Sequence, residues 1–144
     1  GRGETAGEAI VQTIYPTHYS IQLACRQDYP SFFSHEMHFR SAMRYPPTVS
    51  LINVVVRAKS YANAMDDAAG IVRVLRELDP KLASYRVLGP APAPLGKLRG
   101  EYRVQFLMKG SHRRRMREAL VQTLATRPDI ARRTVVDIDP LSVL

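Results

Sequence analysis

The sequence predicts an α+β sandwich behind a short N-terminal segment. From residue 49 onward, stretches with strand and helix periodicity follow one another in the order strand, helix, strand, strand, helix, strand. This βαββαβ order is that of a split βαβ, ferredoxin-like domain. The consecutive prolines Pro46 and Pro47 stop the preceding helix and fix the exit direction of the chain. They predict a boundary between residues 1–44 and the ferredoxin-like domain at 45–144.

The composition is that of a soluble globular protein with an excess of basic residues. The 144 residues are 45% apolar and 24% charged, with a formal net charge of +8, which favours an acidic partner. No apolar run approaches the ~20 residues that a membrane span needs, so no membrane partner is expected. The single cysteine, Cys25, excludes an internal disulfide and a multi-cysteine zinc site within this chain. It agrees with a reducing, cytoplasmic location.

Three elements are expected before the double proline. Residues 7–15 form an apolar run rich in Ile and Val, which predicts a buried strand in need of a sheet. Residues 17–27 and 31–43 predict two helices separated by Pro30. Cys25 lies on the apolar side of the first helix and is expected to be a small buried core residue. The second helix is expected to bury Phe32, Phe33 and Met37.

The domain begins with a strand and a helix. Residues 49–57 are a nearly continuous β-branched run, which is typical of a central strand covered on at least one face. Ser60 is a good N-cap for the helix that follows, and Asp79-Pro80 ends that helix. Three- and four-residue spacing predicts that its buried side consists of Met65, Ala69, Val72, Leu75 and Leu78.

A proline-rich segment then separates two strands. The first strand, at 85–88, is expected to end at Gly89-Pro90, because proline has no N–H to offer a sheet. Proline and alanine alternate from Pro90 to Pro94, which favours an extended polyproline II hinge. A turn is expected at 96–100.

The remaining elements follow from residue 102. Side chains alternate from Tyr102 to Met108, which predicts a strand with one buried face and one basic, wet face. Ser111 is expected to cap the next helix, and residues 134–138 predict the last strand. The buried side of that helix is predicted to contain Met116, Leu120 and Leu124.

Basic residues are concentrated in one part of the chain. From Lys97 to Arg117 there are eight Lys and Arg residues and one acid, Glu101. A concentrated basic surface is the electrostatic footprint of nucleic-acid binding. We therefore expect the loop and the wet strand face to bind nucleic acid through Lys97, Arg99, Arg103 and Lys109.

Four arginines follow Ser111 within two turns of the expected helix: Arg113, Arg114, Arg115 and Arg117. A cation at a helix N-terminus is unfavourable by about 0.3–1 kcal/mol, so an anion-binding role would explain the cluster. Arg113 and Arg117 are four residues apart and share a face. The alternative is a merely solvated face on a basic protein.

Other residues do not form a convincing catalytic or metal site. His35 and His38 lie three residues apart without a third ligand, so no metal site is predicted. Asp137 and Asp139 share a strand face, and Asp139-Pro140 favours strand-end and turn roles over acid–base chemistry. The chain has no P-loop and no Gly-x-Ser-x-Gly motif, so it is not expected to be a self-contained enzyme.

Three segments in order carry a family resemblance. They read GEAIVQT at 7–13, DYPSFFSHEMHFRSAMRYPP at 28–47 and GPAPAPLGKLRGEYR at 89–103. The whole chain resembles the C-terminal part of the primosomal replication-restart helicase family, and Gly1-Arg2 match the last two positions of its sixth helicase motif. The resemblance implies that residues 1–44 are the end of a second helicase lobe with linking helices.

The resemblance also implies a function for the complete protein, that of an ATP-dependent 3′-to-5′ DNA helicase of replication restart. Implied partners are branched or single-stranded DNA, single-stranded-DNA-binding protein and other primosome proteins. Arg2 would contact the ATP phosphates in a catalytic role, and Arg113 and Arg117 would bind the acidic tail of single-stranded-DNA-binding protein. ATP with Mg²⁺, and a zinc site upstream of this chain, are implied for the complete protein.

Two other functions use the same fold. A free-standing basic ferredoxin-like module would bind RNA or DNA, but Tyr102 and Phe106 are assigned to the core rather than to base stacking. A small-molecule regulatory or acylphosphatase-type enzyme would need a phosphate-cradling loop rich in N–H groups. The corresponding segment here is rich in proline instead.

Overall fold

The computed structural model describes residues 7–81 and 83–140. The chain is divided into two compact units, residues 1–43 and residues 44–144. The first unit is a pair of helices, and the second is a sheet covered by helices. Among the helices of the described residues, none combines the length and the apolar character that a bilayer crossing requires.

The first unit holds α1 (Tyr19–Cys25) and α2 (Tyr29–Ala42). Asp28 caps α2, because its carboxylate accepts the N–H of Ser31 at 3.1 Å. The two helices are joined at Glu36, which accepts a hydrogen bond from the Tyr19 hydroxyl at 2.5 Å and pairs with Arg40 at 2.6 Å. The bond from Tyr19, and then that from Arg40, lower the pKa of Glu36.

The predicted strand at residues 7–15 is wrong. These residues form no strand, and Ile10 and Ile14 are 91% and 85% exposed. No strand of the described residues pairs with this apolar run, and a strand without a partner is not stable in water. Two burial predictions also fail, since Cys25 and Phe33 are exposed. Two short helices bury too little surface to enclose them.

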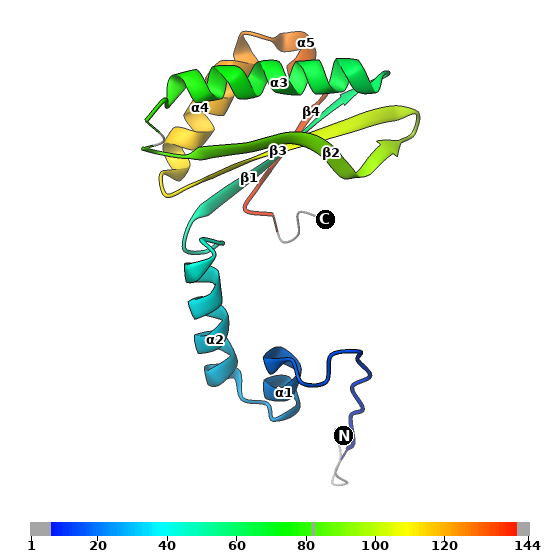
Figure 1. Ribbon diagram of the computed structural model, residues 1–144, viewed down its shortest axis with the longest axis vertical. Coiled ribbons are helices and arrows are strands. Elements are labelled where there is room, and N and C mark those ends of the chain that lie inside the picture. Colours follow the sequence, from blue (N-terminus) through cyan, green and yellow to red (C-terminus); the bar gives the residue numbers. More distant parts are fainter. Residues whose placement is uncertain (1–6, 82, 141–144) are drawn as a thin grey trace. The chain divides into compact units, whose positions relative to one another are not determined.

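The second unit confirms the predicted ferredoxin-like fold class (Figure 1). All neighbouring strands are antiparallel, in the order β2-β3-β1-β4. The two strands in the centre of the sheet are therefore the first and the third. The strands are β1 (Ser50–Ala58), β2 (Arg86–Leu98), β3 (Glu101–Gly110) and β4 (Thr134–Ile138).

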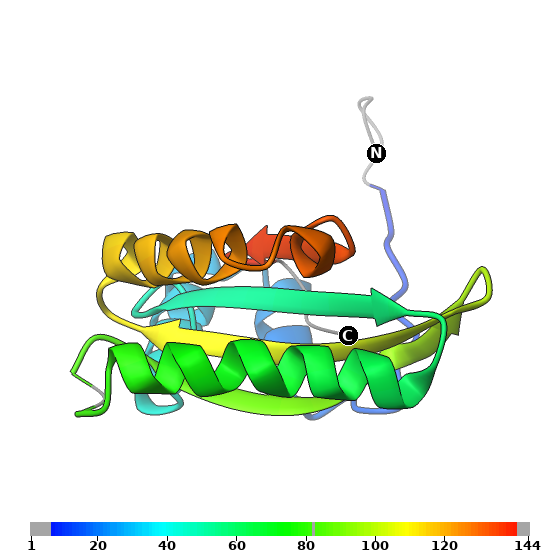
Figure 2. The same ribbon diagram turned by 90° about the horizontal axis from the view of Figure 1, so that it is seen from above.

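The helices of this unit cover one face of the sheet. They are α3 (Tyr61–Leu78), α4 (Arg113–Ala125) and the short α5 (Pro128–Ala131). Figure 2 shows α3 and α4 side by side over the strands, with α5 directly after α4. The opposite side of the sheet, called the open face below, is not covered by these helices (Figure 1).

The alternating side chains of β3 build the core, as the sequence predicts. Val104, Phe106 and Met108 are fully buried, whereas the residues between them are partly exposed. Since β1 pairs with β3 from Ser50 opposite Gly110 to Ala58 opposite Tyr102, alternate residues of β1 join the same core. The predicted buried side of α4 is also confirmed for Met116, Leu120 and Leu124.

The buried stripe of α3 is rotated relative to the prediction. Ser60 caps the helix as expected, because its hydroxyl accepts the N–H of Asn63 at 3.1 Å. Ala69 and Leu78, however, are exposed. Small side chains on the observed buried side of α3 allow the helix to pack closely against the sheet. The spacing of apolar residues does not report this steric requirement. The buried residues are Ala64, Ala68, Ile71, Val72 and Leu75.

The predicted hinge at Pro90–Pro94 is wrong, because β2 continues through it to Leu98. β2 is an edge strand whose neighbour is β3. Alternate residues of a strand direct their N–H groups to opposite edges, so prolines at every second position remove N–H groups from one edge only. Ala91 and Pro92 therefore still pair with β3, while Pro90 and Pro94 fall in two irregular stretches of the register, between Leu88 and Ala91 and between Pro92 and Lys97. Arg76 of α3 also donates to the Gly89 carbonyl at 3.0 Å.

Asp79 ends α3 and organises the turn into β2, as the Asp79-Pro80 sequence predicts. Its carboxylate accepts the N–H groups of Ala83, Ser84 and Tyr85 at 3.1, 2.7 and 3.1 Å. These bonds, that of Ser84 first, lower the pKa of Asp79. The turn places Tyr85 in the core, where its hydroxyl donates to the Leu75 carbonyl at 2.8 Å.

Replacing Asp79 by alanine is expected to destabilise the chain by about 1–3 kcal/mol, because three N–H groups lose a charged acceptor. Asp79→Asn keeps one acceptor oxygen and should lose less. The folded-state pKa lies below 3.8, so the carboxylate stabilises the fold above that pH, and the gain is lost as the pH falls through the folded pKa. Urea unfolding at neutral and acidic pH measures both effects. A wild-type response to acid in Asp79→Asn would contradict this role.

Candidate functional site

The β2–β3 hairpin positions the four residues predicted to bind nucleic acid. Lys97 lies near the end of β2, Arg99 in the turn, and Arg103 and Lys109 on β3. Arg99 and Gly100 have φ values of 50° and 80°, the left-handed values of a tight hairpin turn. The turn therefore holds Arg99, which is exposed, at the tip of the hairpin.

The strand register divides these residues between the two sides of the sheet. Arg103 and Lys109 point to the open face, six residues or ~20 Å apart along the strand. Lys97 is opposite Tyr102, which points to the helix side, and its ammonium lies 4.7 Å from the centre of the Tyr102 ring. The structure thus brings Arg103 and Lys109 to one face and joins Lys97 to an aromatic ring on the other.

Two arginines missed by the sequence analysis also lie on the open face. Arg57 of β1 is opposite Arg103, and Arg86 of β2 is opposite Lys109. Like charges directly opposite each other are unfavourable in a sheet. Glu101 lies 3.6 Å from Arg57 and offsets part of this charge. Only the strand register shows that these arginines lie opposite Arg103 and Lys109, and the register cannot be derived from residue spacing within one strand.

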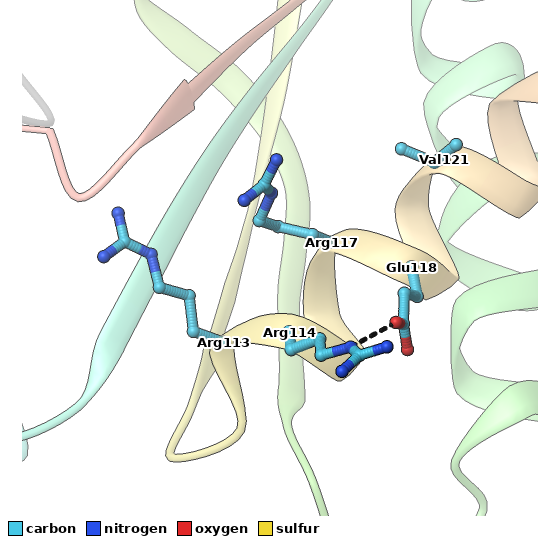
Figure 3. Close-up of a pocket in the computed structure, with 5 residues that line it drawn as sticks. All are labelled: Arg113, Arg114, Arg117, Glu118 and Val121. Atoms are coloured by element: carbon cyan, nitrogen blue, oxygen red, sulfur yellow. Dashed lines mark hydrogen bonds and ion pairs between the residues drawn. The ribbon is translucent and has the colours of Figure 1, made fainter.

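A groove of about 620 Å³ lies at the start of α4 (Figure 3). Its lining residues are Arg113, Arg114, Arg117, Glu118 and Val121. Figure 3 shows Arg113 and Arg117 extending on one side of the helix, while Arg114 turns to Glu118. Positions 113, 117 and 121 follow four-residue spacing and share a helix face. The groove therefore combines guanidinium groups with the exposed apolar side chain of Val121.

The arginines of the groove differ in how far their charges are already offset. Arg113 pairs with Asp139 at 3.1 Å. Arg114 pairs with Glu118 at 2.7 Å, and this hydrogen bond raises the pKa of Arg114. Arg117 is exposed, and no carboxylate of the described residues pairs with it. Of the two arginines predicted to bind a protein partner, Arg117 is the more available.

Ser111 does not cap α4, contrary to the prediction. The N-cap is His112, with φ −106° and ψ 72°, and its side chain makes no capping hydrogen bond. The Ser111 hydroxyl lies 3.1 Å from Nδ1 of His112 instead. The first N–H groups of α4 thus have no side-chain cap and add positive potential at the groove.

Other candidates from the sequence do not belong to these surfaces. Arg2 lies outside the described residues. Across residues 7–81 and 83–140, no group of three or more His, Cys, Asp and Glu side chains could hold a metal ion. Asp139 has the predicted strand-end role, because its carboxylate accepts the N–H of Leu51 at 2.9 Å and its own N–H donates back to the Leu51 carbonyl at 2.7 Å.

Comparison with known proteins identifies the domain that carries the hairpin and the groove at α4. A profile described as the primosomal protein N C-terminal domain matches residues 41–141. The chain belongs to this family. The matched residues include all four strands, the basic hairpin and the groove at α4. Both surfaces are therefore parts of a primosomal protein N C-terminal domain.

Curated relatives agree with the family profile. Replication restart protein PriA of Bacillus subtilis (strain 168) is 38% identical over 109 residues, which are 76% of this chain and 13% of the relative. The protein of the same name from Chlamydia pneumoniae is 30% identical over 148 residues, covering 99% of this chain and 19% of the relative. That of Haemophilus influenzae (strain Rd) is 28% identical over 145 residues, with 97% and 19% covered. The chain thus spans less than a fifth of these relatives and represents the C-terminal domain of a replication restart protein.

In this primosomal protein N domain, Asp139→Asn is expected to change the free energy of unfolding by less than about 1 kcal/mol. The amide oxygen still accepts the Leu51 N–H, and a partly exposed ion pair contributes little. Asp139→Ala should lose about 1–3 kcal/mol, because it removes the acceptor and places alanine at a φ of 50°. Urea unfolding measures both. Equal losses would show that Asp139 acts through its ion pair with Arg113 rather than through Leu51.

Proposed function

We propose that this C-terminal domain binds fork DNA in replication restart, through phosphate contacts that do not read the base sequence. The observation that carries the proposal is the strand register, which sets Arg57 opposite Arg103 and Arg86 opposite Lys109. Such pairs weaken a sheet, and an anionic partner offsets their repulsion. The relatives' name, replication restart protein, supports a DNA partner.

We propose a second partner for the groove at α4, the acidic C-terminal tail of single-stranded-DNA-binding protein. Arg113 and Arg117 extend on one side of the helix, beside the apolar Val121 (Figure 3). Guanidinium groups above helix N–H groups that lack a side-chain cap suit a carboxylate-rich tail. Arg113 already pairs with Asp139, so Arg117 should contribute more to this contact.

For the complete protein we propose an ATP-dependent 3′-to-5′ DNA helicase that acts in the cytoplasm with other primosome proteins. Arg2 would contact the ATP phosphates beside Mg²⁺, in a site completed by residues outside this chain. Zinc would be held by other parts of the protein, because a structural zinc site needs several cysteine or histidine ligands and Cys25 is the single cysteine here.

The variant Lys97→Ala/Arg99→Ala/Arg103→Ala is expected to bind duplex DNA more weakly and with less sensitivity to salt. Each lost phosphate contact lowers the log–log slope of affinity against salt concentration by about 0.9. Fluorescence anisotropy with two duplexes of unrelated sequence, in a series of salt concentrations, measures the slope and the lack of sequence preference. Arg73→Ala, an exposed arginine of α3 with 73% of its side chain accessible, is the matched control.

An unchanged slope in the triple variant would contradict the proposal. The variant Arg86→Ala/Lys109→Ala tests the other end of the open face, where the register places these two residues opposite each other. If DNA crosses the whole face, both variants should lose affinity. Loss in neither, with DNA still bound by the wild type, would remove the open face from the DNA site.

Arg117→Ala is expected to weaken binding of an acidic tail peptide by roughly 5- to 150-fold in Kd, corresponding to about 1–3 kcal/mol for a charge-assisted bond. Arg113→Ala should lose less, because Asp139 competes with the peptide for that side chain. Glu118→Gln should strengthen binding, since it removes a negative charge from the groove. Anisotropy of a labelled peptide measures all three, and a peptide with amides in place of its carboxylates is the control. If both arginine variants keep the peptide and lose DNA, these arginines belong to the DNA surface.

A further inference from the structure

Two tyrosines that lie far apart in the sequence meet at one end of the second unit. Tyr61 begins α3, and Tyr102 lies near the start of β3. Their ring centres are 6.4 Å apart and their planes are inclined by 70°, an edge-to-face contact. Tyr102 packs against the core, whereas Tyr61 is 42% exposed. Tyr61 is thus held by an aromatic neighbour while much of its ring remains in solvent.

One cation lies over a ring of this pair, and two other basic residues belong to the segments that carry the rings. The Lys97 ammonium lies 4.7 Å from the centre of one ring, and Arg99 is exposed at the tip of the same hairpin. Lys59, just before the cap of α3, has 83% of its side chain accessible. The nearby acid, Glu101, is flanked by Arg57 at 3.6 Å and Lys59 at 3.9 Å. The hairpin side of the two rings is therefore positive.

We propose that this end of the domain stacks an unpaired base of a single DNA strand on Tyr61, at a tyrosine site made of Tyr61, Tyr102, Lys97 and Arg99. An exposed aromatic ring beside Lys and Arg is the combination with which proteins bind single strands, because the ring stacks on the base and the cations hold the adjoining phosphates. A duplex hides the faces of its bases in its own stack, so a surface ring cannot reach them. The inference rests on the proposed DNA binding and adds a preference for unpaired strands.

The charges around the tyrosine site set the direction of the bound strand. A groove of about 420 Å³ beside α3 contains both acids and bases, so its charges largely offset each other and leave little attraction for phosphates. Its charged lining residues are Asp66, Asp67, Glu101, Lys59 and Arg133. On the other side of the sheet, the open face carries Arg103 near the same end of β3 and Lys109 farther along it. The backbone of the strand therefore leaves the tyrosine site along the basic hairpin and away from α3.

The test compares single strands with and without bases, using the full 144-residue chain. A short thymine strand and the same strand with abasic positions carry the same phosphates, so a difference in their affinities reports on the bases. The wild type is expected to bind the thymine strand about 5- to 150-fold more tightly, the range for stacking of one base. Tyr61→Leu should lose this preference and Tyr61→Phe should keep it, because only phenylalanine retains an aromatic face. Thermal melting followed by circular dichroism checks the fold of both variants.

Equal affinity of the wild type for the two strands would overturn the tyrosine site, and this comparison needs no variant. Salt-sensitive binding to both strands would in that case leave phosphate-mediated DNA binding standing. A thymine preference that survives in Tyr61→Leu would also overturn the assignment, because the stacking would then lie elsewhere. Absence of binding to single strands and duplexes at low salt would overturn the proposed DNA binding together with this inference.

Discussion

The antiparallel pairing of β1 with β3 is the contact on which the rest of the second unit depends. It joins two strands that are separated in the chain by the whole of α3 and β2, so the closure of that loop precedes the gain from its hydrogen bonds. The same register aligns the buried residues under the helices and sets Arg57 opposite Arg103 on the open face. A slip by one residue would turn the apolar residues outward and the charged ones inward, so the register fixes core and surface together.

The sequence predicted secondary structure correctly where one buried face of an element produces a regular apolar pattern. The alternation of Val104, Phe106 and Met108 is a local property of β3, and it predicted both the strand and its buried side. The prediction failed where the presence of a neighbouring strand determines whether a segment forms a strand. Residues 7–15 have the composition of a strand, but no strand in the described part of the chain pairs with them. Within the segment Pro90–Pro94, Ala91 and Pro92 pair with β3 in spite of the prolines, because an edge strand needs donors on one side only.

The candidate surfaces show the same division. The density of basic residues alone predicted binding surfaces at the hairpin and at the start of α4. Two-residue periodicity predicted that Arg103 and Lys109 share one strand face. Which partners these residues contact depends on segments that are distant in the sequence. Asp139, from the chain beyond β4, reaches Arg113 and leaves Arg117 as the more available cation. Tyr102, which periodicity assigns to the core alone, packs there and also supports an exposed ring from α3.

The prolines of β2 have a consequence for the behaviour of many copies of this domain at high concentration. An open sheet edge is a template on which a strand of another molecule can align, which is the first step of aggregation. Three missing donors in alternate positions interrupt the outward row of N–H groups on this edge, so a continuous intermolecular ladder cannot form there. The opposite edge, β4, is only five residues long. Copies of the domain that are brought close together therefore resist fibre-like association through their sheet edges.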